Sequence, residues 1–163
     1  KWLKNFYDNY DPYENMKGLY LHGSFGSGKT YLIAALFNEL KIKKNTSVEI
    51  IYFPELLRNL KDDFSLMEDK ISYLENVNLL LIDDIGAEKV TSWARDEILG
   101  TILQSRMNNL LPTFFTSNLN IQELETHLSL INESEDKVKA RRIIERIQQL
   151  TDDMELISVN RRK

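Results

Sequence analysis

The sequence contains no cysteine and only two histidines, His22 and His127, which stand far apart along the chain. Without cysteine the chain forms no disulfide bond and no thiolate metal site, and two isolated histidines argue against a zinc site. No apolar run approaches the roughly 20 residues that a transmembrane helix requires. The N-terminal segment, KWLKNFYDNYDPYENMKG, is polar and aromatic and does not match a signal peptide. We therefore expect a cytoplasmic protein with no membrane contact.

The chain also lacks an excess of positive charge, since 21 Lys and Arg stand against 25 Asp and Glu, a formal net charge of −4. This balance argues against a protein that binds nucleic acid over its whole surface, so any such contact must come from a local basic patch. The length of 163 residues corresponds to one domain with its own core. The sequence opens at Lys1 without a methionine, and we expect it to begin within a longer protein.

Glycine is scarce too, with six residues in the chain, yet three of them fall within the stretch GSFGSGKT at 23–30. This stretch matches the pattern G-x-x-x-x-G-K-[ST], in which Lys29 and Thr30 take the last two positions. The apolar segment 18–23 leads into it and predicts a strand, and the segment 30–41 predicts a helix with one apolar face. Strand, glycine-rich loop and helix in this order are the context that a phosphate-binding loop requires.

The residue types in the loop indicate what it binds. Glycines let the backbone turn so that successive N–H groups point at a polyphosphate, and the helix N-terminus adds a partial positive charge. Lys29 would reach the β- and γ-phosphates, and the Thr30 hydroxyl would hold Mg²⁺. A glycine-rich turn with a solvated lysine would leave the flanking strand and helix unexplained. The sequence therefore predicts a nucleoside triphosphate site formed by Gly23, Ser24, Phe25, Gly26, Ser27, Gly28, Lys29, Thr30 and Tyr31.

Two adjacent carboxylates, Asp83 and Asp84, follow an apolar run that ends at Ile82. A continuous apolar run is typical of a central parallel strand that is covered on both faces, and open α/β sheets bind ligands at the carboxyl ends of such strands. We expect Asp83 to bind Mg²⁺ through water and Asp84 to orient or deprotonate the attacking water. A surface loop with two solvated acids would not explain the apolar run before them.

The rest of the chain alternates apolar strands with amphipathic helices, which indicates an α/β fold with a parallel sheet and right-handed crossovers. We expect Thr91 or Ser92 to cap a long helix over residues 91–109. The expected strands are 18–23, 48–53, 77–82, 112–116 and 154–159, and the expected helices are 30–41, 54–64, 65–77, 91–109, 120–128 and 135–150.

Four motifs occur in the order used by AAA+ ATPases: the loop GSFGSGKT, the acidic strand LLLIDDIGAE, the strand end FFTSN and the helix RRIIERI. The longer stretches KGLYLHGSFGSGKTYL and LLLIDDIGAEKVTSWARDEIL resemble bacterial replicative helicase loaders of the DnaC/DnaI family, closest to the DnaI branch. The resemblance covers essentially the whole chain. It implies a P-loop NTPase with a parallel five-stranded sheet, helices on both faces and no C-terminal helical lid. It also implies that 1–163 is one AAA+ domain from the C-terminal part of a longer protein, whose N-terminal domain is absent here.

The resemblance further implies a function and partners. The protein would load the hexameric replicative helicase onto single-stranded DNA, with the binding and hydrolysis of ATP and Mg²⁺ as the switch. It would self-associate or assemble beside another AAA+ initiator. Most active AAA+ members carry glutamate where this chain has Asp84, which is one methylene shorter, so we expect slow hydrolysis that partners stimulate.

Two more residues acquire roles from the resemblance. Asn118 would be the polar sensor of the γ-phosphate or the lytic water, although it is also a candidate N-cap for the helix 120–128. Arg146 would act on the nucleotide of a neighbouring subunit, with Arg142 as the second choice. The alternative is a solvated helix face on which Glu145 pairs with Arg141 or Arg142.

Other segments allow weaker inferences. The aromatics before the loop (Phe6, Tyr7, Tyr10 and Tyr13) either border the adenine or pack against the sheet edge. The helices within 54–75 occupy the place where related proteins contact single-stranded DNA. Phosphate contacts and stacking there would come from Arg58, Lys61, Tyr52, Phe53 and Phe64, and the neighbouring acids would weaken such a surface.

Other functions remain open from the sequence. A transposition-helper ATPase of the IstB type shares the same core. A small P-loop kinase would need an acceptor pocket and an arginine-rich lid. A binding module that uses ATP as a switch would hardly hydrolyse it.

Overall fold

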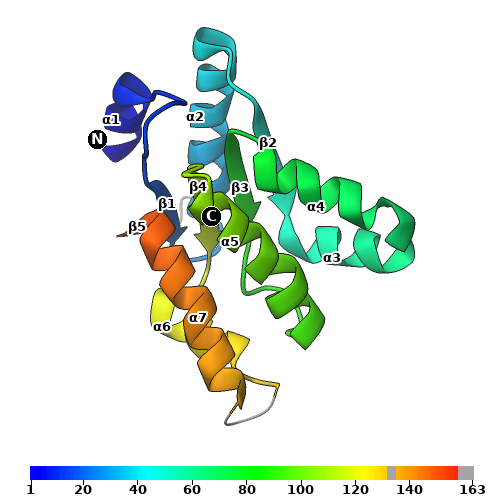
Figure 1. The fold of residues 1–163 in the computed structure, drawn as a ribbon. Helices are drawn as coiled ribbons and strands as arrows, with labels where there is room; N and C mark the ends of the chain where they lie inside the picture. The colour runs from blue at the N-terminus through cyan, green and yellow to red at the C-terminus, as the bar shows by residue number, and fades with distance from the viewer. Residues whose placement is uncertain (132–134, 158–163) are drawn as a thin grey trace.

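A computed structural model describes residues 1–131 and 135–157, and its core is one five-stranded sheet (Figure 1). The strands lie in the order β2-β3-β4-β1-β5, and each neighbouring pair is parallel. This arrangement confirms the expected α/β fold. The strands are β1 (Gly18–His22), β2 (Val48–Tyr52), β3 (Leu79–Asp83), β4 (Thr113–Ser117) and β5 (Thr151–Glu155).

Helices cover both faces of the sheet, as expected. On one face α1 and α2 pack onto Leu19, Leu79 and Leu81, and on the other face the remaining helices pack onto Leu80 and Ile82. Neighbouring residues of β3 therefore serve opposite cores, which explains its continuous apolar run. The helical segments are α1 (Trp2–Asn9), α2 (Lys29–Lys44), α3 (Phe53–Asp62), η1 (Phe64–Leu66), α4 (Met67–Asn76), η2 (Trp93–Leu99), α5 (Gly100–Asn108), α6 (Ile121–Leu128) and α7 (Glu135–Leu150).

The helix expected at 91–109 is a π-helical segment, η2, that continues into the α-helix α5. Of the two proposed caps, Thr91 is the one whose hydroxyl accepts a hydrogen bond, from the Ala94 N–H at 3.1 Å. Ser92 makes no side-chain cap bond.

The last strand begins earlier than expected. We expected 154–159, but β5 spans Thr151–Glu155 and pairs with β1 from Gly18 onward. Residues 158 and 159 lie outside the described residues. The expectation was wrong because β5 is an edge strand on which Asp152 and Asp153 are exposed, so the strand lacks the apolar pattern by which it would be recognised. It is the last element among the residues that the structure describes.

The N-terminal aromatics form part of the core. Phe6 lies between Trp2 and Tyr10 in a stacked row, and its ring forms a T-shaped pair with Phe114 on β4 at a centroid distance of 5.1 Å. Phe6 and Tyr10 are therefore packing residues, whereas Tyr13 is exposed. The sequence analysis did not predict helix α1, which carries Phe6 and ends just before Tyr10.

Two arginines are completely buried, and the sequence analysis missed both. Arg106 on α5 donates to the carbonyls of Val77 and Pro112 at 2.6 and 2.8 Å and to the Thr113 hydroxyl at 2.7 Å. Burial lowers its pKa to about 9. Arg95 on η2 pairs with Asp96 and Asp136. Arg106 thus fastens the starts of β3 and β4 to α5, which fixes where both strands end at the opposite edge.

Within 1–131 and 135–157, no helix is both long and apolar enough to cross a membrane.

Candidate nucleotide-binding site

The glycine-rich loop connects β1 to α2 at the carboxyl edge of the sheet. Gly26 and Gly28 have φ values of 76° and 92°, in the left-handed region that side chains other than glycine rarely adopt. Helix α2 begins at Lys29, one residue before the expected start, so its N-terminus points into the loop. The loop therefore has the local conformation that a phosphate-binding loop requires.

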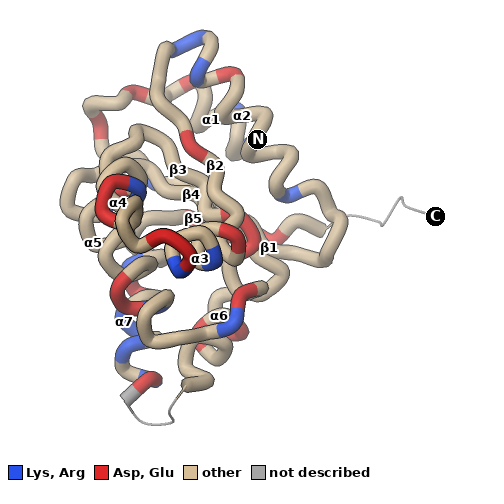
Figure 2. The backbone as a smooth tube through the Cα atoms, turned by 90° about the vertical axis from the view of Figure 1, so that its right-hand side faces the viewer, with Lys and Arg blue, Asp and Glu red and all other residues tan. Residues whose placement is uncertain are grey.

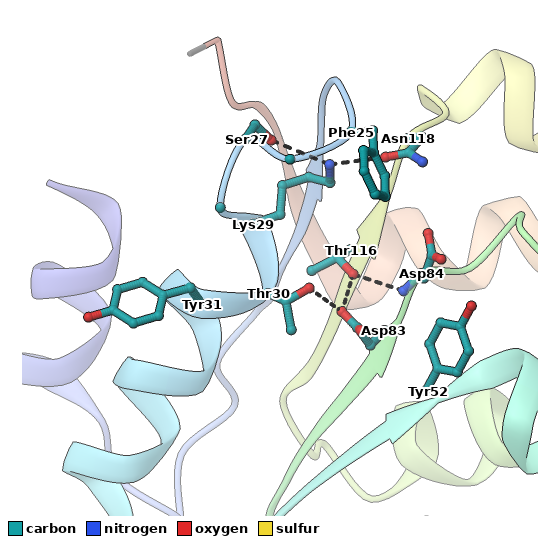
Figure 3. Close-up of a pocket in the computed structure, with 12 residues that line it drawn as sticks. Phe25, Ser27, Lys29, Thr30, Tyr31, Tyr52, Asp83, Asp84, Thr116 and Asn118 are labelled. Atoms are coloured by element: carbon teal, nitrogen blue, oxygen red, sulfur yellow. Dashed lines mark hydrogen bonds between the residues drawn. The ribbon is translucent and has the colours of Figure 1, made fainter. Parts of the chain in front are cut away.

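Lys29 lies inside the curve of this loop and is only 8% exposed. Its Nζ donates to the carbonyls of Gly23 and Ser24 at 2.9 and 3.0 Å. It also donates to Oδ1 of Asn118 at 3.1 Å (Figure 3). Burial lowers the pKa of the Lys29 ammonium, and the carboxylates of Asp84 and Asp83 oppose that shift. The ammonium is thus held where the loop meets the end of β4.

Asp83 and Thr30 meet as expected, although 53 residues separate them in the sequence. One carboxylate oxygen of Asp83, Oδ1, accepts hydrogen bonds from the Thr30 hydroxyl at 2.7 Å and from the Thr116 hydroxyl at 2.6 Å. Among the described residues no group of three or more His, Cys, Asp or Glu is placed to hold a metal ion. One carboxylate and one hydroxyl nevertheless fit Mg²⁺, because phosphate sites complete its shell with water and phosphate oxygens.

Asp84 leaves the strand in a different direction from Asp83. Its φ of 58° is in the left-handed region, and its N–H donates to the Thr116 hydroxyl at 2.9 Å. Burial, and then the charge of Asp83, raise the pKa of Asp84, whereas Lys29 and the hydroxyl of Tyr52 lower it. Figure 3 shows the Tyr52 hydroxyl directed toward the Asp84 carboxylate.

Asn118 follows the end of β4 and faces the loop through its bond to Lys29. The N-cap of α6 is Asn120, whose side chain accepts from the Glu123 N–H at 2.8 Å in a capping box. The capping alternative for Asn118 is therefore wrong, since Asn120 takes that position.

These side chains surround one pocket of about 480 Å³. Thr116 and Tyr52 belong to it, and the sequence analysis assigned neither of them to the site. Both stand at the carboxyl ends of strands that flank β3, which was the available signal. Phe25 is 82% exposed at the tip of the loop, and Tyr31 points away from Asp83 (Figure 3). The lining residues are Phe25, Gly26, Ser27, Gly28, Lys29, Thr30, Tyr31, Tyr52, Asp83, Asp84, Thr116 and Asn118.

The structure does not bring Arg146 and Arg142 into this pocket. Both line a separate cavity on α7 together with Asp96, and the Arg146 guanidinium donates to the Gly100 carbonyl at 3.1 Å. The expected pairing on this helix occurs for Arg141, which lies 3.5 Å from Glu145. Neither arginine therefore lines the nucleotide site of its own chain.

The candidate DNA surface is smaller than expected. Phe53 is only 1% exposed and is not free to stack on a base, and Tyr52, although 42% exposed, lines the nucleotide pocket. Phe64 is 62% exposed and packs edge-on against Trp93, over which the Lys61 ammonium lies. Figure 2 shows basic and acidic residues side by side along α3 and α4.

The fold and the loop geometry define a P-loop nucleotide-binding protein, and comparison with known proteins specifies the family. Residues 2–161 match the family described as AFG1-like ATPase, and the chain belongs to this family. The replicative helicase loader DnaI of Bacillus subtilis (strain 168) is 44% identical over 163 residues, which cover 98% of this chain and 52% of that protein. The replicative helicase loader DnaC of Escherichia coli (strain K12) is 32% identical over 114 residues, which cover 68% of this chain and 46% of that protein.

Among solved structures, a crystal structure of DnaI matches with a TM-score of 0.88 and 49% identity, covering 96% of this chain and 81% of that one. The expected resemblance to the DnaI branch is thereby confirmed. The chain spans about half the length of the curated relatives that it matches.

Proposed function

We propose that this chain is the ATPase domain of a loader that places the hexameric replicative helicase on single-stranded DNA in the cytoplasm. The observation that carries the proposal is the 44% identity to DnaI over 98% of the chain. The geometry supports it, since residues 25–31 of the predicted loop line one pocket with Asp83, Asp84 and Asn118, while the carbonyls of Gly23 and Ser24, which do not line it, accept hydrogen bonds from Lys29. We further propose that residues 1–163 form the C-terminal part of a longer protein and that an N-terminal domain of that protein contacts the helicase.

The nucleotide would be ATP, with its phosphates in the loop 23–28. Lys29 exchanges its carbonyl partners for β- and γ-phosphate oxygens, which are stronger acceptors for an ammonium group. Thr30 and Asp83 would hold Mg²⁺, directly or through water. When bound there, the ion would supply positive charge against the phosphoryl group that is transferred. Thr116 fixes the rotamer of Asp83 by its hydrogen bond of 2.6 Å.

Hydrolysis would depend on Asp84 and Asn118. Asp84 orients or deprotonates the attacking water, and its raised pKa makes it a better proton acceptor than an ordinary aspartate. Asn118, now bonded to Lys29, contacts the γ-phosphate or the water. Because an aspartate reaches less far than a glutamate, we propose that hydrolysis is slow until partners complete the site.

Arg146 would be supplied to a neighbouring subunit, since it lies outside the pocket of its own chain. A charged guanidinium from a second subunit stabilises the transition state for phosphoryl transfer. The active form is therefore an assembly, either of this chain with itself or with another AAA+ initiator. Single-stranded DNA would contact the surface around Phe64, Lys61 and Arg58.

Complex formation tests the proposal. The full-length gene product is mixed with the replicative helicase of the same cell and analysed by size exclusion with light scattering, with and without ATP. We expect a stable complex of defined stoichiometry. No complex in any nucleotide state would contradict the loader function and favour a transposition helper. Phosphate transferred to a small acceptor instead of water would favour a kinase.

A further inference from the structure

Glu88 is a buried acid that the proposed reaction does not use. It lies four residues after Asp84, in the turn between β3 and η2, and its side chain is only 4% exposed. Its Oε2 accepts the Gly86 N–H at 2.7 Å. Burial raises the pKa of Glu88, and hydrogen bonds from backbone N–H groups oppose the shift. A carboxyl group with so little solvent is retained at a cost, which calls for a structural reason.

The turn that carries Glu88, residues 84–88, is fastened to the end of β4. The Ile85 N–H donates to the Thr116 carbonyl at 3.0 Å, and the Ser117 hydroxyl donates to the Ile85 carbonyl at 2.6 Å. Gly86 packs so closely on this segment that a Cβ there would lie 2.8 Å from a methyl carbon of Leu119. The turn with Asp84 and the segment with Asn118 are therefore in direct contact.

Glu88 extends this contact to α6. Its Oε1 lies 3.8 Å from Nε2 of His127, in the last turn of that helix. Nε2 of His127 is buried and has no hydrogen-bond partner among the described residues. Helix α6 starts three residues after Asn118. The contact between Glu88 and His127 therefore joins the last residue of the turn 84–88 to the helix that follows Asn118.

We propose that Glu88 is a positioning residue that, together with His127, holds the turn of Asp84 against the segment of Asn118. The inference rests on the proposed hydrolysis of ATP by this site. Asp84 has a left-handed backbone, a conformation that persists only where surrounding structure enforces it. The hydrogen bond from the Gly86 N–H to the Glu88 carboxylate closes the turn that follows Asp84. The contact between Glu88 and His127 holds this turn against α6. Both groups that face the reacting phosphate then keep a fixed separation.

The test measures ATP hydrolysis in the presence of the replicative helicase and single-stranded DNA. For Glu88→Ala we expect kcat to fall about tenfold, with KM for ATP changed less than about threefold, because a displaced Asp84 affects the chemical step rather than binding. Glu88→Gln should keep at least about a third of kcat, because its amide oxygen still accepts the Gly86 N–H. Glu39→Ala, on the exposed side of α2, is the matched control and should keep the wild-type kcat.

His127→Ala tests the second contact without removing the bond to Gly86. We expect kcat to fall about threefold, and the double variant with Glu88→Ala to be no slower than Glu88→Ala alone, because both act through one contact. If Glu88→Ala does not unfold cooperatively, it is not properly folded, and the kcat values of His127→Ala and Glu88→Gln then decide whether the inference holds.

A wild-type kcat in both alanine variants would overturn the inference, and so would a change in KM alone. An equal loss in Glu88→Gln and Glu88→Ala would also overturn it. Absence of hydrolysis by the wild-type protein with both partners present would contradict the proposed function, and this inference with it.

Discussion

Asp83 and Asp84 are neighbours in the sequence but have different surroundings. Asp83 ends β3 and accepts hydrogen bonds from two hydroxyls, so its lone pairs point toward Thr30 and Thr116. Asp84 has a left-handed backbone, and its side chain lies near the hydroxyl of Tyr52 (Figure 3). Burial of the Asp84 carboxyl group raises its pKa. The first environment suits a ligand of Mg²⁺ and the second suits a base.

The two acids should therefore fail in different ways. Asp83→Asn should weaken the binding of Mg²⁺–ATP by about tenfold or more, because the amide removes the charge that holds the ion. Asp84→Asn should bind Mg²⁺–ATP within about threefold of wild type but lose about 100-fold or more in hydrolysis. Titration calorimetry and phosphate release measure the two effects. Equal loss of binding in both variants would contradict the division of roles.

Tyr52 makes the pH dependence of hydrolysis testable. A base is active when deprotonated, so the rate should fall as the pH falls through the raised pKa of Asp84. Tyr52→Phe removes the hydroxyl that lowers this pKa, so the acid limb of the rate profile should move to higher pH. Tyr73→Phe, on α4 outside the pocket, should leave the limb in place. An acid limb that does not move in Tyr52→Phe would contradict the assignment of Asp84 as the base.

At the scale of elements, the site depends on where strands β3 and β4 end. Arg106 sets both positions from the opposite edge of the sheet, since it donates to the carbonyls of Val77 and Asn78 before β3 and of Pro112 before β4. An arginine in an amphipathic helix gives no sign in the sequence that it is buried, so its role could not be predicted.

Arg106→Met should destabilise the fold by at least about 3 kcal/mol, because several buried carbonyl groups would lose their donor. The exposed Arg58→Ala on α3 is the control and should change the free energy of unfolding by less than about 0.5 kcal/mol. Urea unfolding at pH 7 measures both. A loss below 1 kcal/mol in Arg106→Met would show that water replaces the missing bonds.

The parts of the site that follow strict chemical needs were predictable from the sequence. The sequence assigned Gly28, Lys29 and Asp83 to the site because a tight turn, an ammonium and a carboxylate after an apolar strand are each required by phosphate binding, and the structure places all three around one pocket. Tyr52 and Thr116 were not, because their roles depend on which strands flank β3, and the order of strands is a tertiary property. The position of β5 was predicted wrongly for a related reason, because an exposed edge strand needs no apolar face and so gives no strand pattern in the sequence.

At the scale of the whole molecule, the nucleotide pocket and the arginines of α7 are separate features of one chain. Such a separation is expected for a protein that completes its catalytic site between subunits. Arg146→Ala should therefore leave ATP binding by the isolated chain within about twofold of wild type. In the assembly with helicase it should reduce hydrolysis by about 100-fold or more, measured by phosphate release. A comparable loss of hydrolysis in the isolated chain would contradict action in trans. The same measurements on Arg142→Ala show which of the two arginines acts on the neighbouring subunit.

The measurement that tests the central claim most directly is helicase loading itself. The replicative helicase is incubated with circular single-stranded DNA and the full-length protein, and the helicase that sediments with the DNA is measured. We predict that loading requires the protein with ATP and that Lys29→Ala reduces loading to the level without loader. Loading that is equal with and without ATP, or equal for wild type and Lys29→Ala, would contradict the claim that this nucleotide site controls the delivery of the helicase.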